Sequence, residues 1–96
     1  MSSRSQEQIL SDLGSMLRDF NGKEYSGEIS AKTRLFRDLG MVSIDAVILA
    51  ETLERFYSYS FAFSQFLSDI GKKGNSDIEV GELASFLHSQ MRGAAG

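Results

Sequence analysis

The chain contains no cysteine and no proline, and His88 is the single histidine among its 96 residues. Without cysteine there is no disulfide, no thiolate nucleophile and no thiolate metal ligand, so the redox compartment stays open. One histidine argues against a histidine-based zinc centre and against a Ser–His–Asp triad. We therefore expect no metal site, no catalytic residues and no enzymatic activity.

A basic excess and a long apolar run are also missing. Ten lysines and arginines stand against 13 aspartates and glutamates, which gives a formal charge of −3. Nucleic-acid binders present a basic patch, so we expect no nucleic-acid partner. The longest strictly apolar run covers residues 46–50, too few for a membrane span, and the first residues lack a signal-peptide segment. We expect a cytoplasmic monomer without a membrane partner.

Hydrophobic residues recur at three- and four-residue steps, which is the period of a helix. The first stripe comprises Ile9, Leu13, Met16, Leu17 and Phe20. It predicts a helix from about Ser5 to Asn21-Gly22, where glycine favours a helix end. Residues 23–33 have no sustained period, and we expect a long surface loop there.

Three further helices are predicted after Gly40. The apolar face of the second is formed by Ile44, Val47, Leu49, Ala50, Leu53, Phe56 and Tyr57, and Ser43 is in the N-cap position. A short third helix spans 63–70, and the last carries Val80, Leu83, Ala84, Leu87 and Met91. The prediction is an all-α fold, a small four-helix bundle with three longer helices, one short helix and a long first loop. It forms a single domain, 1–96, with its core at about 5–92 and a frayed end at 93–96.

The residues at the start of the predicted second helix are the ones that indicate a function. A glycine turn delivers Ser43 to this helix, where its hydroxyl has two possible functions. It caps a backbone N–H group, or it anchors a phosphate, because a helix N-terminus favours an anion. The spacing of the residues does not distinguish capping from phosphate anchoring, and the two functions are compatible. Asp45 also suits the helix dipole, although its charge would repel a phosphate or help to hold a metal ion during transfer.

Three segments resemble the modification segment of acyl carrier proteins: Asp38-Leu39-Gly40, Ser43-Ile44-Asp45 and Leu53-Glu54-Arg55-Phe56. The order of the predicted helices over roughly 8–92 is also similar. Those proteins are small four-helix bundles in which a serine carries 4′-phosphopantetheine. The resemblance implies that Ser43 is the attachment site of a covalent 4′-phosphopantetheine and that acyl or aminoacyl groups are carried as thioesters. The weak overall charge favours carriers of polyketide or nonribosomal-peptide biosynthesis.

The resemblance also implies partners, namely a phosphopantetheinyl transferase and the enzymes that load, extend, modify or release the carried group. Residues 38–54 contain four acids and no lysine or arginine, and in the family this helix docks on basic patches of partner enzymes. Ile48 falls on the polar side of the helical wheel, beside the acids. The expected partner-binding residues are Asp38, Met41, Val42, Ile44, Asp45, Val47, Ile48, Glu51 and Glu54.

Val42 departs from the family pattern, because an acid usually precedes the serine. This leaves an alternative, an unmodified helical adaptor that binds a partner through the same acidic helix. The aromatic residues that follow are also open to two interpretations. They pack in the core, as aromatics at helical spacing usually do, or they line a pocket for a carried chain. They are Tyr57, Tyr59, Phe61, Phe63 and Phe66.

Overall fold

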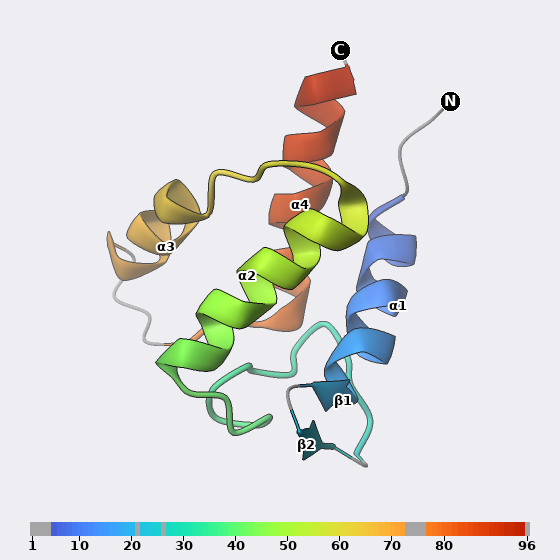
Figure 1. Cartoon of the computed structure of the whole chain (residues 1–96), viewed down its shortest axis with the longest axis vertical. Coiled ribbons are helices and arrows are strands. Elements are labelled where there is room, and N and C mark those ends of the chain that lie inside the picture. The colour runs from blue at the N-terminus through green and yellow to red at the C-terminus, as the bar shows by residue number, and fades with distance from the viewer. Residues whose placement is uncertain (1–4, 21, 26, 73–76, 96) are drawn as a thin grey trace.

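The computed structural model describes residues 5–20, 22–25, 27–72 and 77–95, and at residues 23, 43 and 93–95 it describes the backbone only. Over these ranges the chain is mostly helical, with four helices (Figure 1). The elements are α1 (Gln6–Leu17), β1 (Asp19–Phe20), β2 (Lys23–Glu24), α2 (Ser43–Tyr57), α3 (Phe63–Lys72) and α4 (Val80–Ala95). The predicted set of three longer helices and a shorter third one is confirmed. No helix within these ranges is long and apolar enough to cross a lipid bilayer.

Helix α1 begins at a capping box. Ser5 Oγ accepts the Gln8 N–H at 3.1 Å, and Gln8 Oε1 accepts the Ser5 N–H at 2.9 Å. The helix ends at Leu17, so the predicted end at Asn21-Gly22 is wrong. Gly22, at a φ of 81°, instead lies in the connection between the antiparallel strands β1 and β2. Asn21 is outside the described residues.

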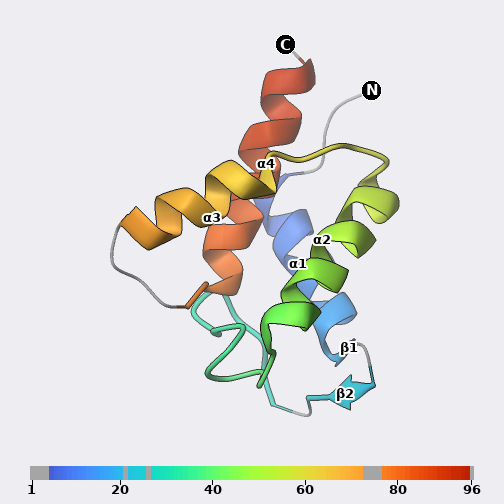
Figure 2. The ribbon, with the colours of Figure 1, turned by 60° about the vertical axis from the view of Figure 1, so that its left-hand side comes forward.

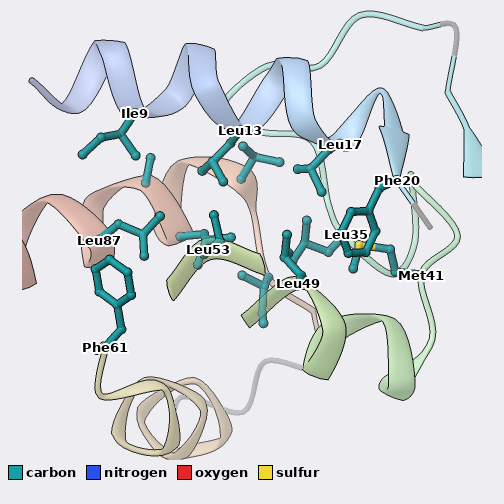
Figure 3. Packing of buried hydrophobic residues seen from close by; sticks show 14 of the residues in the cluster. Ile9, Leu13, Leu17, Phe20, Leu35, Met41, Leu49, Leu53, Phe61 and Leu87 are labelled. Carbon is teal, nitrogen blue, oxygen red and sulfur yellow. The ribbon is translucent and has the colours of Figure 1, made fainter. Parts of the chain in front are cut away.

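The core lies where α1, α2 and α4 meet. Figures 1 and 2 show α2 across the α1–α4 pair, with α3 on the side of α4 away from α1. Leu53 of α2 is fully buried and points toward Leu13 of α1 (Figure 3). The stripe of α4 contributes Val80 and Leu87, also fully buried. Burying each such side chain contributes about 1.5–3 kcal/mol to the stability of the fold.

The face that α2 buries differs from the predicted one. Ile44, Val47 and Phe56 are 61%, 54% and 55% exposed, although all three were expected on the apolar face. Ile48, which was expected on the polar side, is partly buried and packs against the core. Helix α2 has apolar residues around most of its circumference, so periodicity alone does not say which side turns inward.

Helix α4 is held at its start by the loop before α2. The Val80 N–H donates to the Thr33 carbonyl and the Gly81 N–H to the Ala31 carbonyl, both at 2.8 Å. At its other end, α4 continues through Ala95, so residues 93–95 extend the helix where fraying was expected. Gly96 is not among the described residues. These two bonds join the loop before α2 to the start of α4.

Candidate functional site

The chain reaches α2 through a compact turn over residues 34–41. The Asp38 and Leu39 N–H groups both donate to the Arg34 carbonyl at 3.1 Å, and Asp38 Oδ2 accepts the Arg34 N–H at 2.8 Å. Gly40 follows at a φ of 70°, a conformation that side chains other than glycine adopt at a cost. The Met41 N–H then donates to the Leu35 carbonyl at 3.1 Å. These bonds fix the direction in which the chain reaches α2.

Asp77 ties this turn to the chain before α4. Its carboxylate accepts the Phe36 and Arg37 N–H groups at 3.0 Å and the Ile78 N–H at 2.8 Å. Burial alone would raise the pKa of Asp77, but the three N–H donors and the charge of Arg34 outweigh it and lower the pKa below its ordinary value. Asp77 was not among the candidate residues, because its partners lie 40 residues away in the sequence.

Helix α2 starts at Ser43, and Val42 is its N-cap residue. This corrects the prediction that Ser43 is the cap. Val42 is extended, with φ −118° and ψ 176°, and its side chain has no atom that can accept a hydrogen bond. Asp45 compensates, because its Oδ2 accepts the Val42 N–H at 3.0 Å. Ser43 is therefore the first helical residue, while its side chain lies outside what the structure describes.

Apolar side chains flank Ser43 on the surface. Val42 and Ile44, its two neighbours, are 54% and 61% exposed, and Val47, one turn further, is 54% exposed. Leu67 of α3 is 50% exposed and was not predicted from the sequence as part of this surface. Because exposed apolar groups of this size next to one another are typical of contact surfaces, we name Val42, Ile44 and Val47 the apolar rim of Ser43.

Most of the acidic side chains in residues 38–54 are buried or hydrogen-bonded to the chain's own backbone. Asp45 is only 2% exposed. Glu54 is half-buried, and its Oε2 accepts the Phe61 N–H at 2.9 Å. Asp38 is exposed but braces the turn at Arg34. Glu51 is exposed on α2. The acidic helix predicted to dock on a basic partner therefore presents less free charge than its composition indicates.

Two predicted contact residues are removed from the surface by burial. Met41 is 5% exposed and belongs to the core cluster, and Asp45 lies beneath the first turn of α2. Neither side chain offers a partner enough area to contact. Ile48 is partly buried as well. Of the nine predicted contact residues, Asp38, Val42, Ile44, Val47 and Glu51 are exposed.

A cavity of about 500 Å³ lies between α2 and α3. Its lining is mostly apolar and includes Val47, Ala50, Leu53, Phe63, Phe66 and Leu67. Phe63 and Phe66 therefore lie at a pocket, whereas Phe61 is a core residue at 6% exposure. The Tyr57 hydroxyl donates to Asp12 Oδ2 of α1 at 2.9 Å, and the Tyr59 hydroxyl donates to the Gln90 carbonyl of α4 at 2.8 Å.

Among the residues that the structure describes, no group of three or more metal-ligating side chains is placed to hold an ion. Comparison of the chain with protein-family models, with curated proteins and with solved structures finds no match.

Proposed function

We propose that the protein is an acyl carrier protein, with 4′-phosphopantetheine attached to Ser43. The observation that carries this proposal is that the segment resembling the family's modification segment contains a serine, Ser43, at the first residue of α2. Such a residue lies at a surface helix terminus, where a second enzyme can reach the chain. Its neighbours Val42 and Ile44 are more than half exposed, which supports access from solvent.

The residues around Ser43 fit a phosphate ester. The positive end of the α2 dipole favours an anion by roughly 0.3–1 kcal/mol at an exposed site. The buried Asp45 carboxylate is two residues away and opposes part of that gain. When bound, the group would supply a thiol on a flexible arm, which holds an acyl or aminoacyl group as a thioester. The chain's own role is to present the arm and to raise its effective concentration at a partner's active site.

The apolar cavity between α2 and α3 supports a hydrophobic cargo. Its volume of about 500 Å³ is within the range of small-molecule sites. Leu67 and Val47, which belong to its lining, are also exposed at the surface. The partners under this proposal are a phosphopantetheinyl transferase and the enzymes that load, extend, modify or release the carried group, in polyketide or nonribosomal-peptide biosynthesis.

A transfer reaction tests the assignment. During transfer from coenzyme A, the Ser43 oxygen would form a new bond to the phosphorus that carries the pantetheine. The P–O–P bridge of coenzyme A would break and adenosine 3′,5′-bisphosphate would leave, while the hydroxyl proton passes to a base of the transferase. We expect proteolytic fragment masses to place one phosphopantetheine on Ser43. Modification at Ser58 or Ser60 in the α2–α3 loop would contradict the assignment, so Ser60→Ala serves as a control that stays modified.

The alternative, an unmodified helical adaptor, is favoured by Val42, which stands where the family has an acid. An adaptor would bind its partner through the acidic helix α2, and Ser43→Ala would leave that affinity unchanged. Absence of any adduct on the wild-type chain, together with unchanged partner binding by Ser43→Ala, would favour the adaptor.

A further inference from the structure

Helix α2 begins without the usual side-chain cap. At an N-cap, a serine, threonine, asparagine or aspartate normally accepts one of the first helical N–H groups. Val42 has no such acceptor, although its carbonyl accepts the Asp45 and Ala46 N–H groups at 2.9 and 3.2 Å. The order of the first turn must therefore come from another group.

The Asp45 side chain orders this first turn. Its Oδ2 accepts the Val42 N–H at 3.0 Å, and its own N–H donates to the Val42 carbonyl at 2.9 Å. These two bonds close a ring over residues 42–45, and Ser43 lies within it. At 2% exposure, the Asp45 side chain cannot be reached by a partner without opening the fold. The Val42 backbone therefore gives Asp45 a route to the neighbouring Ser43.

We infer that Asp45 is a positioning residue for the modification of Ser43. Its carboxylate holds Val42 in the extended conformation, and this fixes the backbone of Ser43 in the first turn of α2. The inference rests on the proposed function and assigns Asp45 a role inside the fold, in place of a direct contact with the transferase. What the role requires is a hydrogen-bond acceptor at this position, so negative charge alone is not the essential property.

Two substitutions separate the acceptor from the charge. Asp45→Asn removes the charge and keeps an amide oxygen that can accept the Val42 N–H. Asp45→Leu has similar bulk and removes the acceptor. Tyr57→Phe is the matched control, because it deletes one hydrogen bond, to Asp12, at the opposite end of the same helix. All variants are used as the full chain, with melting curves to show that they fold.

Two readouts are compared for each variant. The first is hydrogen exchange of the Val42 amide by NMR in the unmodified protein, which needs no activity. The second is kcat/KM for phosphopantetheinylation. For Asp45→Leu we expect faster Val42 exchange and kcat/KM lower by about tenfold or more, with the larger loss in kcat. For Asp45→Asn and Tyr57→Phe we expect a protected Val42 amide and kcat/KM within about threefold of wild type.

Two outcomes would overturn the inference while the proposed function stands. In the first, Asp45→Asn is modified as slowly as Asp45→Leu although its Val42 amide is protected, which would mean that the transferase reads the charge. In the second, Asp45→Leu is modified at the wild-type rate. If Asp45→Leu fails to fold, the Asn variant alone decides, since slow modification with a protected Val42 amide contradicts the inference. A wild-type chain that is never modified would instead remove the proposed function itself.

Discussion

Asp77 Oδ1 accepts the Phe36 N–H at 3.0 Å, a bond between residues 41 positions apart in the sequence. With the bonds from Arg37 and Ile78, it holds the turn before α2 against the start of α4. This turn fixes where the chain enters α2, whose first residue is Ser43. The stability of this one carboxylate contact is thus coupled to the geometry of the candidate site.

The Asp77 contact predicts a loss of stability in acid. Because the pKa of Asp77 is lowered in the folded chain, its stabilisation is present above the unfolded-state pKa of about 3.9 and is lost as the pH falls through the folded pKa. Asp77→Asn should lower the free energy of unfolding by about 1–2 kcal/mol at pH 7. In urea unfolding, this difference should shrink below about pH 4. A difference that is constant between pH 7 and pH 3 would contradict this role.

Gly81 is predicted to be intolerant of a side chain. A Cβ atom there would lie 2.9 Å from both the Cβ and the carbonyl oxygen of Ala31, whereas a Cβ at Gly14 of α1 would meet nothing within 4 Å. Gly81→Ala should therefore destabilise the fold by about 1–3 kcal/mol despite its better helix propensity. Gly14→Ala should stabilise it by up to about 1 kcal/mol. Thermal unfolding of both variants measures this, and equal effects would show that the α4 contact is not tight.

The apolar rim is predicted to contribute more to partner binding than charge. Ile44→Ser should raise the KM for the transferase by about tenfold, because truncation of a central apolar contact costs about 1.4 kcal/mol. Phe56→Ser is the control, since Phe56 is about as exposed, at 55%, but lies at the other end of α2. Both variants should unfold within about 0.5 kcal/mol of wild type.

The salt dependence of KM for the transferase distinguishes apolar contacts from charged contacts. If the rim dominates, adding salt should change KM less than Ile44→Ser does, because screening weakens only charged contacts. Glu51→Lys should likewise have the smaller effect, although Glu51 is exposed on the same helix. A steep salt dependence with little effect of Ile44→Ser would contradict the apolar contact and favour docking on a basic patch.

Periodicity predicted the helices well where one face is apolar. The stripe from Val80 to Met91 is interrupted by polar residues, and α4 buries the predicted side. The hairpin of β1 and β2 was not predicted, because strands of two residues are too short to show an alternation of apolar and polar residues. In α2, Leu49 and Leu53 are buried as predicted, whereas Ile44 is exposed and Ile48, which was expected on the polar side, packs against the core.

The sequence predicted where α2 starts but not the surroundings of that start. The spacing around Ser43 correctly indicated the start of a helix after a glycine turn. The burial of Asp45 was unexpected, because acids are ordinarily surface residues unless a partner satisfies them. The bonds of Asp77 join distant segments, and no local pattern reports such a contact.

The most direct test of the carrier assignment is the intact mass of the protein after co-expression with a broad-specificity phosphopantetheinyl transferase. The wild-type chain should gain the mass of one phosphopantetheine. Ser43→Ala should gain none, while its melting temperature stays close to that of wild type. An unmodified wild-type chain, or an adduct that persists in Ser43→Ala, would contradict the assignment of Ser43 as the attachment site.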